Sequence, residues 1–232
     1  MPATEQTIGL VSLRTGRTAP LLHNGKAIPS AIVKEAAAGP LALGFLGFEG
    51  DEQADRVHHG GEGKAVCVYP SERYDLWNDE LKAGFGLGAF GENVSTRGLL
   101  EEDVYIGDTF RIGTAVVQVN QPRQPCFKLA ARHGIPDLPI RLQQTGYTGF
   151  YWRVLEEGMV RPDSGLERLD RDPLGVTVAE ANRIRYRDKS DRNGILRVLA
   201  VDALSATWRT TFESLLASLD AGVSSKLEQN RQ

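Results

Sequence analysis

The stretch VYIGDTFRIGTAVVQV, residues 104–119, decides the fold class of this chain. Segments 109–112 and 115–119 are rich in β-branched and aromatic residues, and Gly113-Thr114 separates them at the spacing of a tight turn. This pattern predicts a β-hairpin, with residues 104–106 as a further strand that leads into it. Several short strands joined by Gly-rich turns favour a closed or partly closed barrel over alternating strand–helix units.

Further strands are expected on both sides of this hairpin. The nearly continuous apolar run 65–69 ends at Pro70, which is the pattern of a short buried strand. Residues 71–77 have helical character, and Ser71 is the expected N-cap of that helix. Weaker patterns predict strands at 8–13, 151–155 and 165–170.

The sequence period becomes helical from Thr177 onward. Thr177 and Glu180 form a capping box, and apolar residues then recur at steps of three and four. The fold is therefore predicted to be mainly β with some α, a barrel domain with peripheral helices followed by a small three-helix bundle. The expected helices are 178–186, 193–199 and 205–219. The expected domains are 1–172 and 176–222, with a disordered tail over 223–232.

Composition excludes several classes of protein. The chain has 232 residues, 41% hydrophobic and 25% charged, which is typical of a globular protein and not of a disordered one. Its net charge of −3 argues against nucleic acid as a partner. No apolar run reaches the roughly 18–20 residues of a membrane helix. With two cysteines and no secretory signal pattern at the start, a cytoplasmic location is expected.

The segment QPRQPCFK, residues 121–128, carries the most reactive side chain. Pro122 and Pro125 stiffen a loop that presents Cys126 between Arg123 and Lys128. Neighbouring cations favour a thiolate, which ligates soft metals or attacks electrophiles. The alternative is that Cys126 is a small buried hydrophobic residue, as most free cysteines are. The other cysteine, Cys67, lies inside an apolar strand run and is interpreted as a core residue.

The segment VHHGGEGKAV, residues 57–66, combines two histidines, a Gly-rich loop and Lys64. Glycines allow backbone N–H groups to approach an anion, and the lysine adds a positive charge. Neighbours in an extended segment point to opposite faces, so at most one of His58 and His59 would face a given site. The alternative is a solvated turn.

Three other patterns carry less information. The GxGxxG match at 86–91 lacks the strand before it and the helix after it that a dinucleotide site requires. The acidic stretch 47–52 is interpreted as a turn with solvated carboxylates, because it lacks the spacing of a calcium loop. Arg153 follows a Gly-punctuated turn and is either a surface residue of a strand or an anion clamp.

The order of these motifs is more specific than any one of them. Together they resemble the MOSC domain, which is related to the C-terminal part of molybdenum-cofactor sulfurases. The resemblance is to its YiiM-like branch, where a small three-helix domain follows, and it covers about residues 5–220. The matching motifs are GxxGD (47–51), HHGGxxKAV (58–66), GEN (91–93), GD (107–108), QPRxPC (121–126) and GxTGFYxRVL (146–155).

This resemblance implies a β-barrel-like fold and binding of the molybdenum cofactor, in which the dithiolene of a phosphate-bearing pterin holds the metal. Cys126 matches the position of the protein ligand to molybdenum. Several members of the family reduce N-hydroxylated compounds, such as hydroxylaminopurines, to amines. The resemblance therefore implies a molybdenum-dependent N-hydroxyl reductase.

The remaining candidate residues are assigned around Cys126. His59 is the expected proton donor, because an unperturbed imidazole titrates near neutral pH. Asn93 is expected to orient the pterin or an oxo group. The other expected cofactor contacts are His58, Lys64, Arg123, Lys128 and Arg153. The sequence has no iron–sulfur cysteine set, so the electrons are expected from a separate donor protein, and the chain is expected to be a monomer or homodimer.

Three alternatives stay open at this point. A carrier of molybdenum cofactor or of persulfide sulfur would use the same pocket without turnover. A cysteine hydrolase would need a histidine base in contact with Cys126. A zinc site would need a third ligand besides Cys126 and one of the histidines.

Overall fold

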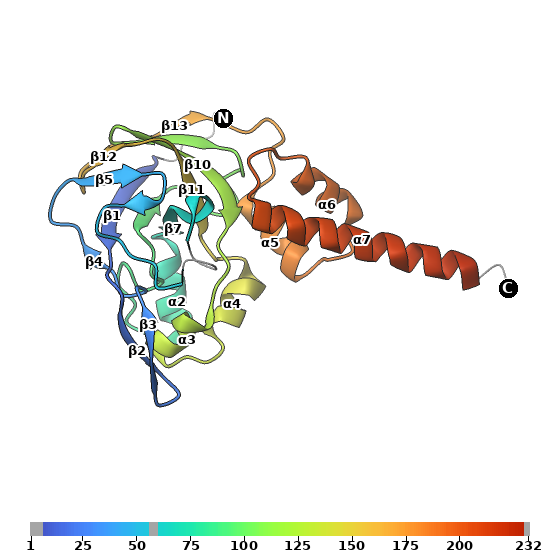
Figure 1. Ribbon diagram of the computed structural model, residues 1–232, viewed down its shortest axis with the longest axis horizontal. Coiled ribbons are helices and arrows are strands. Elements are labelled where there is room, and N and C mark those ends of the chain that lie inside the picture. Colours follow the sequence, from blue (N-terminus) through green and yellow to red (C-terminus); the bar gives the residue numbers. More distant parts are fainter. Residues whose placement is uncertain (1–6, 56–59, 230–232) are drawn as a thin grey trace.

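The computed structural model describes residues 7–55 and 60–229 of the chain (Figure 1). A curled β-sheet with helices at its periphery forms the larger part, and a group of helices lies beside it. The main sheet has the strand order β13 (Leu166–Asp170), β9 (Thr109–Ile112), β10 (Ala115–Pro122), β11 (Phe150–Glu156), β7 (Val66–Pro70), β8 (Val94–Arg97), β1 (Gly9–Thr15) and β4 (Glu35–Ala36).

The sheet is partly closed. All neighbouring strands run antiparallel except β7 and β8, which pair in parallel, and β1 also comes into contact with β13. Two smaller sheets complete the β-structure. They are β12 (Gly158–Val160) with β5 (Leu41–Gly44) and β6 (Gly47–Phe48), and β2 (Ala19–His23) with β3 (Lys26–Ser30). The predicted class, a barrel-like sheet with peripheral helices and a helical C-terminal part, is confirmed.

The hairpin predicted from the sequence is present, but its first segment is not a strand. Ile112 pairs with Ala115 across Gly113-Thr114, as expected. Residues 104–106 form no strand of the sheet, and Tyr105 makes only an isolated bridge to Thr177. The cause is long-range, because the buried Asp108 carboxylate accepts hydrogen bonds from the backbone N–H groups of Tyr105 and Asp172 and holds this segment against the interdomain linker.

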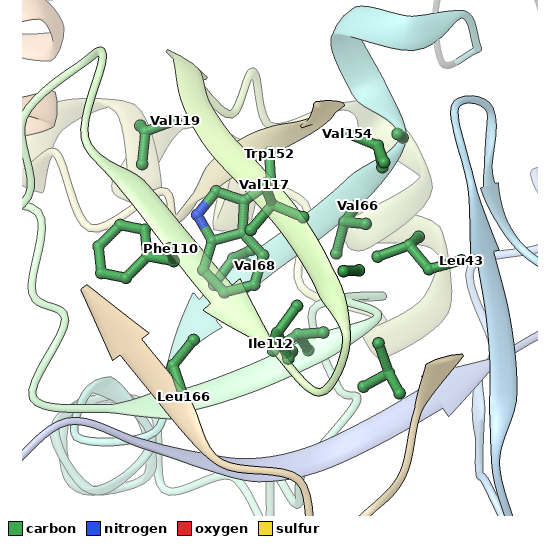
Figure 2. Close-up of a cluster of buried hydrophobic side chains, with 14 of the residues drawn as sticks. Leu43, Val66, Val68, Phe110, Ile112, Val117, Val119, Trp152, Val154 and Leu166 are labelled. Carbon is green, nitrogen blue, oxygen red and sulfur yellow. The ribbon is translucent and has the colours of Figure 1, made fainter. Parts of the chain in front are cut away.

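Alternation along the strands separates two faces of the sheet. In β7, Val66 and Val68 point into the hydrophobic core of the barrel, where they meet Trp152 of β11 (Figure 2). Tyr151 pairs with Cys67 in the same register. Because successive side chains of a strand point to opposite faces, Cys67 and Tyr151 lie on the other face of the sheet. That face bears the candidate site.

The peripheral helices pack on the sheet through a second cluster around Tyr69, Trp77 and Phe90. These helices are α2 (Arg73–Leu81), α3 (Phe127–His133) and α4 (Leu138–Thr145). A short 3-10 turn, η1 (Glu62–Lys64), precedes β7 in the chain and buries none of its residues. The prediction of Ser71 as the N-cap of α2 is wrong. Ser71 continues the strand pairing through its N–H, which donates to the Thr96 carbonyl, and Glu72 takes the cap position without a side-chain bond.

Three helices, α5 (Val178–Tyr186), α6 (Arg192–Leu199) and α7 (Ala206–Gln229), form the C-terminal part. The Thr177 side chain accepts from the Glu180 N–H, as the capping pattern predicts. α7 continues beyond the expected end at residue 219 and covers 223–229, where a disordered tail was expected. The sequence after Gly222 contains no proline, so nothing in it stops the helix. Residues 230–232 lie outside the described residues.

The helical part shares its core with the barrel. Ile106 of the barrel and Val176 of the linker are fully buried in the helical cluster around Trp208, and Val178 of α5 is buried in the barrel cluster. Backbone bonds run across the boundary, from the Ile106 N–H to the Val176 carbonyl and from the Val178 N–H to the Val104 carbonyl. The two parts therefore stabilise each other. Among the described residues, no helix combines the length and apolarity needed to cross a bilayer.

Candidate functional site

An open cavity lies on the face of the sheet that bears Cys67 and Tyr151. The cavity brings together five of the residues predicted from the sequence, which come from three separate segments of the chain. They are Lys64, Asn93, Arg123, Cys126 and Lys128.

One predicted residue lies away from this cavity, and two others lie outside the described residues. Arg153 lies on β11, and its guanidinium donates two hydrogen bonds to Oε1 of Gln118 on the neighbouring strand, at 2.9 and 2.5 Å. It is not among the residues that line the cavity, so the anion-clamp prediction is not supported. His58 and His59 lie outside the described residues.

Cys126 stands at the junction between the proline-stiffened loop and α3. Its backbone is extended, its carbonyl accepts from the Leu129 N–H, and its thiol makes no capping hydrogen bond to the helix. The Arg123 N–H donates to the Gly149 carbonyl at 3.0 Å, which ties this loop to the start of β11. The loop thus presents a half-buried thiol at the cavity wall from a fixed backbone.

Arg123 is the unusual charge of the cavity. Its side chain is 5% exposed, and its Nη1 atom is buried without a hydrogen-bond partner. Burial by itself lowers the pKa of Arg123, but the ionisable Cys67, Tyr151 and Cys126 nearby raise this pKa overall. The guanidinium therefore stays charged with an unsatisfied donor. An anionic or oxygen-bearing group in the cavity would satisfy it.

Cys67 and Tyr151 line the cavity too, and neither was predicted from the sequence as a site residue. Burial raises the pKa of the Cys67 thiol, and Arg123 partly opposes this shift. Burial, and then the nearby Cys67, raise the pKa of Tyr151. Cys67 is buried, as its interpretation as a core residue expects, but strand alternation turns it away from Val66 and Val68 and toward the cavity. That alternation was the available signal.

A buried ion pair forms another part of the wall. The Lys34 Nζ atom lies 2.5 Å from Oδ1 of Asp51, and the two side chains are 7% and 3% exposed. Asp51 also accepts from the Gly16 N–H at 2.7 Å and from the Asn93 amide at 2.8 Å. The interpretation of the acidic stretch as solvated carboxylates is therefore wrong for Asp51. Nothing in the local sequence marks Lys34, which meets Asp51 only through the fold.

Asn93 holds this wall together. Its Oδ1 atom accepts from the Cys67 N–H at 3.1 Å, and its Nδ2 atom donates to Asp51 and, at 3.3 Å, to the Arg14 carbonyl. Both ends of the amide thus have protein partners. The predicted role of orienting a bound pterin or oxo group is not supported by this arrangement, which favours a role in positioning β7 and Asp51.

Lys64 and Lys128 add positive charge from two sides of the cavity. Burial lowers the pKa of Lys64, and the nearby Asp55 carboxylate opposes that shift. The carboxylates of Asp51 and Asp55 also face the cavity, so its walls carry charges of both signs. Anion binding here would depend on specific contacts rather than on net charge.

The donor set fits a metal-bearing anionic cofactor. A thiolate at Cys126 is a ligand for soft metals, and the unpartnered Nη1 of Arg123 is a donor for an oxygen or phosphate. Within 7–55 and 60–229, no cluster of three or more His, Cys, Asp or Glu side chains is arranged to hold a metal ion by itself. The cavity can thus supply a soft thiolate ligand and several cations around a group that brings its own further ligands.

The comparisons agree with this reading of the fold and the cavity. The MOSC domain family matches residues 55–167, and the YiiM-like, 3-alpha helix domain matches residues 176–219. Protein YiiM of Escherichia coli (strain K12) is 43% identical over 188 residues, which are 80% of this chain and 84% of that protein. The chain belongs to the YiiM-like branch of the MOSC family.

A solved structure and a fungal protein are also similar to this MOSC protein. The crystal structure of YiiM from Geobacillus stearothermophilus superposes with a TM-score of 0.78 at 38% identity, covering 90% of this chain and all of that one. A protein of Gibberella moniliformis (strain M3125 / FGSC 7600) named "Reductase" is 36% identical over 186 residues, which are 78% of this chain and 33% of that protein. A fungal reductase thus contains a segment similar to most of this MOSC protein.

We predict that the Asp51→Asn substitution destabilises this MOSC protein by about 3–5 kcal/mol, because it leaves the buried Lys34 ammonium without its counter-charge. Urea unfolding followed by fluorescence would measure the change. Asp163→Asn is the matched control, since Asp163 pairs with Arg161 on the surface, where such a pair contributes about 0–1 kcal/mol. Equal effects of the two substitutions would contradict the assignment of a buried pair.

Proposed function

We propose that this MOSC protein is a molybdenum-cofactor-dependent oxidoreductase that reduces N-hydroxylated compounds, such as hydroxylamines and hydroxylaminopurines, to amines. The observation that carries the proposal is that one cavity contains both the Cys126 thiol and a buried guanidinium nitrogen of Arg123 that has no hydrogen-bond partner. Membership of the MOSC family and the name of the fungal relative support a redox role.

The proposed site divides binding between a thiol and several cations. Cys126 would hold the molybdenum, while Arg123, Lys64 and Lys128 would contact the oxygens and phosphate of the cofactor. The chemistry that the cofactor supplies when bound is two-electron reduction of the N–O bond, in which R–NHOH takes up two electrons and two protons and yields R–NH₂ and water. The residues of the chain bind, orient and supply protons.

Tyr151 and His59 are the residues proposed to act on the substrate oxygen. Tyr151 faces the cavity with a pKa raised mainly by burial, so its hydroxyl stays protonated and can donate a hydrogen bond to a substrate oxygen. His59 stays the predicted proton donor, on its chemistry alone. Arg123, charged and buried, would orient the N–O oxygen without giving up a proton.

A separate protein would deliver the electrons. The sequence contains only Cys67 and Cys126, too few for an iron–sulfur cluster, and both lie at the cavity. The GxGxxG stretch follows α2 and leads into β8 rather than into a helix, so it does not form a dinucleotide site. We therefore propose an electron-donor protein as the partner, and an N-hydroxylated small molecule as substrate.

The test is to purify the full chain from a host that makes molybdenum cofactor. We expect near-stoichiometric molybdenum by elemental mass spectrometry and pterin by fluorescence after oxidation. We also expect the protein to catalyse reduction of a hydroxylaminopurine with electrons from a chemical reductant. The same preparation from a host unable to make the cofactor is the control. A fully loaded protein without turnover would refute the reductase and favour a cofactor carrier, while protein without cofactor from the competent host would refute both.

A further inference from the structure

Ser205, the residue just before α7, connects the helical part to the barrel. Its N–H donates to the Asn120 carbonyl at 3.0 Å, and its hydroxyl donates to Oε1 of Gln121 at 2.7 Å. Asn120 and Gln121 are buried residues of β10. Ser205 of the three-helix domain therefore bonds to the backbone of Asn120 and to the side chain of Gln121, which are neighbouring residues of β10.

The side chains of Asn120 and Gln121 both donate hydrogen bonds to one further carbonyl group. Nδ2 of Asn120 and Nε2 of Gln121 both donate to the Gly63 carbonyl, at 2.9 and 2.8 Å. A Cβ atom at Gly63 would lie 3.3 Å from Nδ2 of Asn120 and 4.0 Å from Cβ of Ser205, so the segment is packed closely against both residues. Gly63 lies in η1, whose last residue is Lys64.

Lys64 is the residue through which this contact reaches the cavity. The Lys64 N–H donates to the Gly61 carbonyl at 2.9 Å, which closes the 3-10 turn, and its side chain lines the cavity. The peptide that joins Gly63 to Lys64 is thus fixed on one side by β10 and on the other by the turn. Because Gln121 cannot rotate without losing its bond to Ser205, the helical part fixes the orientation of that peptide.

We propose that Ser205 is a positioning residue for the cavity, through which the three-helix domain fixes the η1 turn and so the place of Lys64. That Lys64 contacts the cofactor rests on the proposed function, but the positioning itself does not. The three-helix domain thereby becomes part of the construction of the site and not only an appendage to the barrel.

A purely structural role for Ser205 has to be separated from this one. The Ser205 hydroxyl also accepts from the Trp208 N–H at 3.3 Å and so caps α7. Ser205→Ala would therefore lower the stability of the protein in either case. The distinguishing measurements must be made at η1 and at Lys64, which lie outside α7.

The experiment compares Ser205→Ala and Ser205→Thr in the full chain with Ser214→Ala as the matched control. The Ser214 hydroxyl is exposed on α7 and bonds only to the Thr210 carbonyl of its own helix. The first readout is hydrogen exchange of a peptide that covers residues 61–64. The second is the pKa of Lys64, measured by NMR after reductive ¹³C-methylation and assigned with Lys64→Arg. The third is the molybdenum and pterin content.

We expect Ser205→Ala to speed exchange at 61–64 about fivefold, the factor that corresponds to loss of one net hydrogen bond of about 1 kcal/mol. The pKa of Lys64 should rise toward the ordinary lysine value as the turn loosens and the ammonium becomes hydrated. Ser205→Thr, which keeps the hydroxyl, should restore both values, and Ser214→Ala should change neither.

Unchanged exchange at 61–64 and an unchanged Lys64 pKa in Ser205→Ala would overturn the inference, whatever happens to thermal stability. The proposed function is judged by a different reading, the cofactor content. Changed exchange in a protein that holds no cofactor in any variant would support the positioning and refute the proposed function. Normal cofactor content with unchanged exchange would leave the function standing and refute the positioning.

Discussion

Cys126→Ser is expected to remove bound molybdenum and to abolish reduction of N-hydroxylated compounds, while the protein stays folded. A serine hydroxyl has nearly the shape of the thiol, but it does not ionise near neutral pH and is a hard ligand, so it cannot replace a thiolate on a soft metal. Cys126 is half-buried at the cavity wall and caps no helix through its side chain, so the substitution costs little stability. Elemental mass spectrometry and turnover assays measure the effect.

Cys67→Ser is the matched control for this variant. It makes the same chemical change in the same cavity, beside Tyr151, but on a strand instead of the proline-stiffened loop. We expect it to keep its molybdenum and most of its activity. An active Cys126→Ser variant with normal metal content would refute the proposed mechanism, and loss of metal from Cys67→Ser alone would move the ligand role to Cys67.

Deletion of residues 176–232 is expected to destabilise the barrel far more than any single substitution proposed above. The deletion exposes Ile106 and takes Val178 out of the barrel core. Truncation of one buried aliphatic side chain already costs about 2–5 kcal/mol, and backbone hydrogen bonds across the boundary are lost as well. The sum approaches the roughly 5–15 kcal/mol by which whole domains are stable. The truncated chain should therefore be largely unfolded or aggregated.

Circular dichroism and urea unfolding of the truncated chain would test this expectation. The control deletion removes only 230–232 and should behave as the full chain does. The opposing outcome is a stable truncated barrel that still loads cofactor and accepts a chemical reductant but no longer accepts electrons from its protein donor. That result would make the three-helix domain a docking module and not a part of the folded core.

Local pattern was sufficient for much of the secondary structure. The hairpin around Gly113-Thr114 and the helix after Thr177 depend on the period of apolar residues and on capping within a few positions, which a single sequence displays. The secondary-structure predictions are wrong at positions where residues far away in the chain determine the local structure. Hydrogen bonds to the Asp108 carboxylate hold the segment before Gly107 against the linker. The hydrogen bond from the Ser71 N–H to the Thr96 carbonyl continues the strand pairing at Ser71.

The sequence by itself determined the barrel class and the helical C-terminal part, and it selected Cys126 as the candidate metal ligand. Each of these depends on neighbouring residues or on the order of motifs. Only the tertiary structure decided the rest of the cavity. Three features of the cavity join segments that are separate in the chain. They are the pairing of Lys34 with Asp51, the place of Cys67 beside Tyr151 on the cavity side of the sheet, and the contact from Ser205 through Gln121 to Gly63. The physical reason is strand register, which sets the face that each side chain occupies and the neighbours it meets.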